Sequence, residues 1–133
     1  MFIPTAIVTC LALILYCVFT ARVALARAEY KINAPATSGH PIFERTFRIQ
    51  QNTGEQLIIM LPGLWMFSGL VSPIWASLLG LVWIVGRLVY AISYTRAAES
   101  RALGFVIGFL ANVALVLGSL TAAVLVALRG GLF

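Results

Sequence analysis

The chain has 133 residues, of which 62% are hydrophobic and 10% charged, with a net charge of +5 at pH 7. A soluble domain is about half apolar and about a quarter charged, so this composition excludes an ordinary soluble protein. A spanning helix needs about 20 apolar residues, and four such helices with short connections account for nearly the whole chain. We therefore predict one all-α membrane domain over residues 1–133, folded as a four-transmembrane-helix bundle.

The first predicted helix covers about residues 4–27 and has an uncharged middle. Arg22 and Arg27 mark its end, where long basic side chains can reach the membrane interface. Cys10 and Cys17 lie seven residues apart on one face. We expect them to pack as small hydrophobes rather than to form a disulfide or act as catalytic thiols. The start of the chain lacks a basic segment, so no cleavable signal peptide is expected.

A loop over residues 32–41 is rich in Asn, Pro, Ser and Gly, and the second predicted helix follows over about residues 42–71. His40 is the only histidine, and no cysteine or carboxylate cluster surrounds it. We expect it to pack in the loop or to face solvent, and we expect no metal site.

The second predicted helix begins with a polar stripe formed by Arg45, Arg48, Asn52 and Glu55. Their spacing of three, four and three residues places them within roughly an 80° arc of a helix. Two guanidinium groups, an amide and a carboxylate on one stripe suit a zwitterionic ligand that carries carboxylates and an amine. The spacing is equally typical of a structural ion-pair ladder, for example between Arg48 and Glu55.

A turn at Ser72-Pro73 separates the second helix from a third, predicted over about residues 74–97. A second polar set follows with steps of three, four and seven residues: Arg87, Tyr90, Tyr94 and Arg101. Arg101 shares the face of the other three only if the helical phase continues past Glu99. The alternative for the tyrosines is the aromatic belt found at membrane interfaces.

The fourth predicted helix covers about residues 102–128. Gly104 and Gly108 form a G-x-x-x-G pair, and Ala76 with Gly80 repeats the small-residue spacing on the third helix. Such pairs let helix backbones approach closely, so we expect tight helix contacts at both places.

The positive charges are grouped in two connections rather than spread over a face that would bind nucleic acid. By the positive-inside rule, both connections face the cytoplasm and both termini face outward. The prediction is a multi-pass integral membrane protein, in a bacterial inner membrane or alternatively in the endoplasmic reticulum. The basic residues concerned lie between the first and second apolar runs and between the third and fourth: Arg22, Arg27, Lys31, Arg45, Arg48, Arg87, Arg96 and Arg101.

The stretch from Phe43 to Glu55 reads F-E-R-x-x-R-x-Q-x-N-x-x-E. It resembles the signature of the MAPEG family, the membrane-associated proteins of eicosanoid and glutathione metabolism. The likeness continues through Gly86-Arg87-Leu88-Val89-Tyr90, Tyr94 and Arg101, and covers about residues 20–110. It is similar in particular to the branch that contains microsomal glutathione transferase 2 and leukotriene C synthase.

The resemblance implies a homotrimer that binds glutathione, its co-substrate, between adjacent subunits on the cytoplasmic side. It places Arg101 against the glutathione sulfur as the catalytic residue, because an adjacent guanidinium lowers the pKa of a thiol from its usual value of about 8.5. The same resemblance assigns glutathione binding to Arg27, Arg48, Gln50, Asn52, Glu55, Arg87, Tyr90 and Tyr94.

The implied activity is a detoxifying membrane glutathione S-transferase that conjugates lipophilic electrophiles, with reduction of lipid hydroperoxides as a second activity. Three positions depart from leukotriene C synthase: Gln56 replaces a tyrosine, and Ala28 and Lys31 replace arginines. These departures favour a general transferase over specialised leukotriene chemistry.

Three other functions remain open at this point: a non-catalytic lipid-binding scaffold of the same fold, a prostaglandin E synthase-type isomerase, and a small transporter subunit. A scaffold has no need of a thiolate-stabilising arginine such as Arg101. A transporter needs a polar path across the bilayer, whereas the polar residues here gather at one side.

Overall fold

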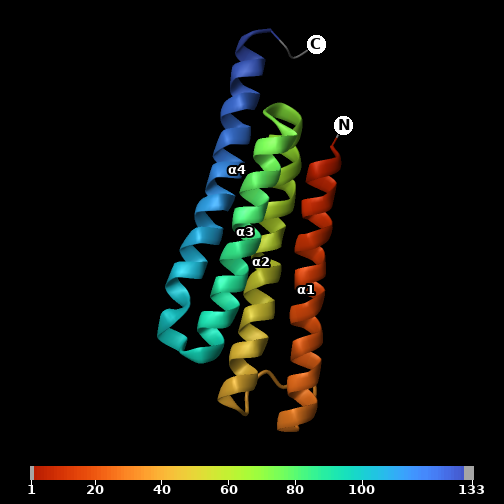
Figure 1. The fold of residues 1–133 in the computed structure, drawn as a ribbon, viewed down its shortest axis with the longest axis vertical. Helices are drawn as coiled ribbons and strands as arrows, with labels where there is room; N and C mark the ends of the chain where they lie inside the picture. The colour runs from red at the N-terminus through yellow and green to blue at the C-terminus, as the bar shows by residue number, and fades with distance from the viewer. Residues whose placement is uncertain (1, 131–133) are drawn as a thin grey trace.

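The computed structural model of the chain describes residues 2–130. Within them, helices α1 (Ile3–Tyr30), α2 (Pro41–Leu70), α3 (Pro73–Arg96) and α4 (Ala102–Leu128) form one bundle, with a short 3-10 helix η1 (Ala98–Arg101) before α4. The helices lie side by side, and both termini are at the same end of the bundle (Figure 1). The α1–α2 loop and the η1 turn lie at the opposite end, which we call the polar end. The predicted all-α bundle is confirmed.

Three of the four predicted helices agree with the structure to within one residue at each end. The first helix is longer than predicted, since α1 continues to Tyr30 and ends where Lys31 adopts a left-handed φ of 55°. Its last turns are rich in alanine, which has the highest helix propensity, and no breaker occurs before Asn33. The predicted turn at Ser72-Pro73 is confirmed, with Ser72 Oγ accepting from the Trp75 backbone N–H at the start of α3.

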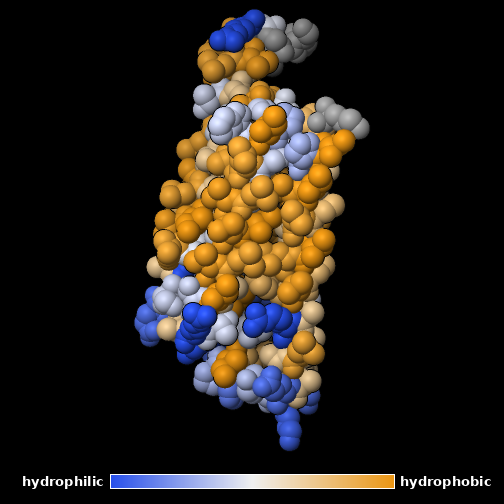
Figure 2. Space-filling model, viewed as in Figure 1, coloured by the Kyte–Doolittle hydropathy of each residue, from blue (hydrophilic) through white to orange (hydrophobic). Residues whose placement is uncertain are grey.

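Among residues 2–130, three segments are long and apolar enough to cross a membrane: α1, α3, and η1 together with α4. The second helix falls short of that criterion because its first half carries the polar stripe. It nevertheless packs against each of the other helices and runs the length of the bundle. On the face seen in Figure 2, a wide apolar belt crosses the middle of the molecule and hydrophilic residues gather at the polar end. This is the surface of an integral membrane protein.

The close approach predicted for the small residues of the fourth helix is confirmed. Gly104 and Gly108 of α4 are both buried against α3. A Cβ atom built on Gly86 of α3 would lie only 2.7 Å from the backbone nitrogen of Gly108 and 3.2 Å from the carbonyl oxygen of Gly104. The two backbones therefore touch, and α4 is held tightly along α3 beside Tyr90.

Cys10 and Cys17 are free and exposed on the outer surface of α1. They form no disulfide, and the expectation that they pack as small buried hydrophobes is wrong for the single subunit. The reason is rotational: α1 turns Val8, Ala12 and Phe19 toward the bundle instead, and all three are buried.

The centre of the bundle contains a buried polar network. Trp83 Nε1 donates to Gln56 Oε1 at 3.2 Å, and Asn112 Nδ2 donates to the same oxygen at 3.3 Å. Because an indole N–H can only donate, the Gln56 amide must turn its oxygen rather than its nitrogen toward Trp83. The network joins α2, α3 and α4 within an otherwise apolar core, whose main buried members are Val8, Ala12, Leu57, Met60, Leu64, Ala76, Ala111 and Leu115.

Trp83→Phe is expected to destabilise the protein by about 2 kcal/mol, because a hydrogen bond is lost and the replaced ring leaves a gap in the core. The effect is measured as the midpoint of thermal unfolding in detergent. The matched control is Trp75→Phe, since Trp75 is 63% exposed and its loss removes little packing. Equal midpoints for the two variants would show that the buried network contributes nothing measurable.

Candidate functional site

A groove of about 450 Å³ opens near the polar end between α2, α3 and the start of α4. We call it the arginine–tyrosine groove. Five of its six lining residues were predicted from the sequence as site residues, and they come from α2, α3 and η1. The sixth, Phe105 of α4, was not predicted. The residues that line it are Arg48, Asn52, Tyr90, Tyr94, Arg101 and Phe105.

The side chain of Arg101 returns to α3 across the turn. Its Nη1 donates to Tyr94 Oη at 3.1 Å, and its guanidinium carbon lies 5.1 Å from the centre of the Tyr94 ring. The helical phase does not continue to this position, because Ala97 is extended and η1 then reverses the chain direction. The turn, rather than a shared helix face, therefore brings Arg101 beside Tyr94.

Tyr90 and Tyr94 are held by packing beneath the groove. Their rings are 5.5 Å apart, and they form a buried cluster with Phe19 of α1 and Ile49 of α2. Only 4% of Tyr90 and 8% of Tyr94 is exposed. The two rings are therefore packed inside the bundle, whereas the alternative interpretation placed them in the aromatic belt at a membrane interface.

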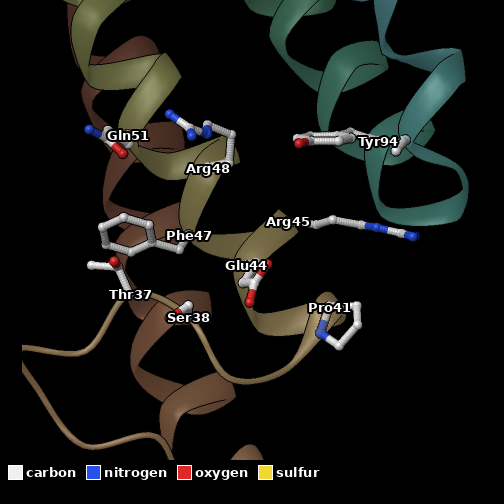
Figure 3. Close-up of a pocket in the computed structure, with 10 residues that line it drawn as sticks. Thr37, Ser38, Pro41, Glu44, Arg45, Phe47, Arg48, Gln51 and Tyr94 are labelled. Atoms are coloured by element: carbon white, nitrogen blue, oxygen red, sulfur yellow. The ribbon is translucent and has the colours of Figure 1, made fainter.

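A neighbouring cavity of about 470 Å³ shares Arg48 and Tyr94 with the arginine–tyrosine groove and extends to the α1–α2 loop. In Figure 3, Tyr94 points from α3 toward Arg48 on α2, and Arg45 extends below it toward the η1 turn. Arg45 Nη1 lies 3.5 Å from the carbonyl oxygen of Thr95. Arg45 and Arg48 thus both line this neighbouring cavity, together with the carboxylate of Glu44.

Arg87 does not line either cavity. It is completely buried, with its guanidinium carbon 4.1 Å from the centre of the Tyr90 ring. Its Nε, Nη1 and Nη2 atoms have no hydrogen-bond partner in the part of the chain that the structure describes. A direct contact between Arg87 and a ligand in the groove, as predicted from the sequence, is therefore not supported by this arrangement.

Gln50 lies on the other side of α2. Its Nε2 donates to Tyr16 Oη of α1 at 2.7 Å. Both residues line a second groove of about 480 Å³ between α1 and α2, together with Glu55. In one subunit the predicted residues are thus divided between two grooves: Arg48 and Asn52 face α3, whereas Gln50 and Glu55 lie along the α1 side.

Arg27 binds the loop that follows α1. Its Nη1 donates to the carbonyl oxygens of Ala36 at 2.7 Å and Ile32 at 3.4 Å. Its guanidinium carbon also lies 4.9 Å from the centre of the Phe43 ring. In this structure Arg27 positions the loop at the polar end and does not line either groove.

The chemistry of the arginine–tyrosine groove suits an anion. Arg48 and Arg101 contribute two fixed positive charges, and Tyr90 and Tyr94 contribute phenol groups. Asn52 Oδ1 is buried beside the groove and has no hydrogen-bond partner among residues 2–130. Across residues 2–130, no group of three or more His, Cys, Asp or Glu side chains is placed to hold a metal ion.

Tyr16 and Phe105 line the grooves but were not predicted as site residues from the sequence. Tyr16 holds the Gln50 amide, and its hydroxyl would lie 3.0 Å from a Cβ atom added to Gly54. The available signal was a lone hydroxyl-bearing aromatic residue within an apolar helix. Phe105 carries no such signal, since exposed phenylalanines are ordinary in a membrane helix, and only the tertiary structure places it at the groove.

The family model that matches this chain is that of the MAPEG family, over residues 5–121. An uncharacterized protein of Synechocystis is 48% identical over 115 residues, which is 86% of this chain and 84% of that protein. Human microsomal glutathione S-transferase 2 is 44% identical over 87 residues (65% of this chain), and bovine leukotriene C4 synthase is 36% identical over 94 residues (71% of this chain). The match spans 59% of the human protein and 63% of the bovine one, less than two thirds of either.

Proposed function

Because this chain belongs to the MAPEG family, we propose that it is a membrane glutathione S-transferase that binds glutathione as a thiolate and conjugates it to lipophilic electrophiles. The observation that carries the proposal is the contact of Arg101 with Tyr94 in a groove that also contains Arg48 and Tyr90. Of the relatives reported above, the human protein is named a glutathione S-transferase and the bovine protein a leukotriene C4 synthase. The proposal extends that kind of chemistry to this chain.

In the proposed reaction the glutathione thiol loses its proton to water, and the guanidinium of Arg101 stabilises the resulting negative charge. The thiolate attacks an electrophilic carbon, so that a sulfur–carbon bond forms while the bond to the leaving group breaks. With an aryl halide the leaving group is the halide. With an epoxide a carbon–oxygen bond breaks, and the alkoxide takes a proton from water.

Binding is proposed to rely on complementary charge. Arg48 pairs with a glutathione carboxylate, for which a guanidinium offers a bidentate contact. Asn52 contributes its side-chain amide, and Glu55 suits the amino group of the ligand. Arg27 and Gln50 complete the predicted set, with Gln50 held in place by Tyr16.

A homotrimer is proposed because the predicted residues lie in two separate grooves of one subunit. A site between subunits would join the arginine–tyrosine groove of one copy to the α1–α2 groove of the next. The arginine–tyrosine groove lies near the polar end, which we place on the cytoplasmic side from the distribution of basic residues. The α1–α2 groove extends from Gln50 toward the middle of the bundle. The cyanobacterial relative favours the inner membrane of a bacterium as the location.

Reduction of lipid hydroperoxides is proposed as a second activity of the same thiolate. Attack of the thiolate on the terminal oxygen forms glutathione sulfenic acid and breaks the oxygen–oxygen bond. The released alkoxide takes a proton from water and becomes an alcohol. A second glutathione then forms the disulfide and water. The apolar belt beside the groove would supply such substrates from the bilayer (Figure 2).

The test is the ultraviolet thiolate absorbance of glutathione on addition of the purified, detergent-solubilised chain at pH 7. We expect a signal that saturates with glutathione concentration and is strongly reduced in Arg101→Ala. Glutathione binding without a thiolate signal would instead support the non-catalytic scaffold. If glutathione does not bind, the polar stripe of α2 is structural and the proposal is wrong.

A further inference from the structure

Arg87 of α3 is a fully buried cation. It is 0% exposed, and none of its three guanidinium nitrogens has a hydrogen-bond partner within residues 2–130. Burying an unpaired charge in a medium of low polarity is strongly unfavourable. An ionisable residue in a membrane helix is for this reason more often functional than structural.

The chain holds no acidic side chain that compensates this charge. It has only four acidic residues, and each of them is exposed: Glu29, Glu44, Glu55 and Glu99. The groups near the Arg87 side chain on the facing helices are neutral. A Cβ atom added to Gly108 of α4 would lie 3.7 Å from Arg87 Cδ and 3.4 Å from Gln56 Oε1 of α2. The positive charge is therefore not cancelled inside the subunit.

The one aromatic contact of Arg87 leads to the arginine–tyrosine groove. Its guanidinium carbon lies 4.1 Å from the centre of the Tyr90 ring, and Tyr90 lines the groove. A ligand atom in van der Waals contact with the other side of that ring would lie roughly 8 Å from the guanidinium. The charged and titratable groups that face the groove are Arg48 from α2, Tyr90 and Tyr94 from α3, and Arg101 from η1.

We propose that Arg87 is a positioning residue that favours the glutathione thiolate from behind Tyr90, without touching glutathione. The inference rests on the proposed function, because the thiolate is the negative charge that this function creates in the groove. Arg87 holds the Tyr90 ring by a cation–π contact, and its uncancelled charge raises the electrostatic potential in the groove. The thiol proton leaves to water, and no bond to Arg87 forms or breaks.

The arrangement predicts that replacing Arg87 by an apolar residue weakens the thiolate without lowering the stability of the fold. Replacing a buried charge by a hydrophobic side chain of similar size is often neutral or stabilising. A residue needed only for folding would instead lower stability when replaced. Arg87→Met is therefore expected to unfold at the same temperature as the wild type or at a higher one, while it disfavours the thiolate.

The experiment is a pH titration of the thiolate absorbance of bound glutathione for the full chain in detergent. We expect Arg87→Met to raise the apparent pKa of the bound thiol by about one unit, which is about a tenfold loss of thiolate stabilisation. Arg87→Lys, which keeps the charge, is expected to stay close to the wild type. The matched control is Arg96→Met, since Arg96 is an exposed cation of the same helix and is screened by solvent.

Several outcomes would overturn the inference. The first is a thiol pKa that stays unchanged in Arg87→Met while glutathione is still bound. The second is a pKa shift in Arg87→Lys equal to that in Arg87→Met, which would exclude a role of the charge. A shift in Arg96→Met as large as that in Arg87→Met would show a general charge effect. If Arg87→Met does not fold, Arg87→Gln serves in the same titration. If the wild type produces no thiolate signal, the proposed function itself fails, which is a separate result.

Discussion

Arg101→Ala is expected to lower the turnover of glutathione conjugation about a hundredfold, with little change in glutathione affinity. A preorganised donor that stabilises developing or fixed negative charge typically contributes a factor of this size. The side chain is exposed and donates to Tyr94 Oη, so its removal leaves the buried tyrosine cluster intact. The measurement is steady-state kinetics with 1-chloro-2,4-dinitrobenzene, alongside equilibrium glutathione binding.

Arg48→Ala provides the contrasting variant. Arg48 lines the same groove from α2, and we assign it to a glutathione carboxylate. Loss of a charge-assisted contact is expected to weaken glutathione binding about tenfold or more, with a smaller change in turnover at saturation. If Arg101→Ala kept wild-type turnover, or if both variants lost affinity equally, the separation of binding and catalytic roles would be wrong.

Gly104→Ala is expected to destabilise the protein by about 3 kcal/mol or more and to abolish activity. A Cβ atom at this position would overlap the backbone nitrogen of Tyr90 and would lie 2.5 Å from its Cα and 2.8 Å from the carbonyl oxygen of Gly86. These are backbone atoms, which cannot rotate away as a side chain can, so α4 must separate from α3. Because Tyr90 forms the wall of the groove, the displacement also disturbs the site.

Gly69→Ala is the matched control for Gly104→Ala. Gly69 also lies within a helix, but nothing is within 4 Å of a Cβ atom built on it. Alanine favours helix more than glycine by about 1 kcal/mol, so this variant is expected to be as stable as the wild type or more stable. Thermal unfolding in detergent compares the two, and a Gly104→Ala variant with wild-type stability would contradict the close packing of α3 and α4.

The helices were predictable because their signals are local. Apolar runs of sufficient length, Pro41 and Pro73 at helix starts, and a breaker-rich loop define where helices begin and end. The Ser72-Pro73 turn and the glycine pair of α4 were likewise readable from short segments. The end of α1 was placed too early because basic residues suggested an interface, although the alanine-rich segment continues the helix to Tyr30.

The sequence by itself determined the membrane class, the bundle, the family resemblance and the set of polar residues at one end of the molecule. Only the tertiary structure decided which of those residues face a common groove. Helical periodicity assigns a residue to a face of its own helix, but the neighbour of that face depends on helix rotation and crossing. For this reason Gln50 lies against Tyr16, Arg87 is buried behind Tyr90, and Arg101 reaches Tyr94 through the η1 turn.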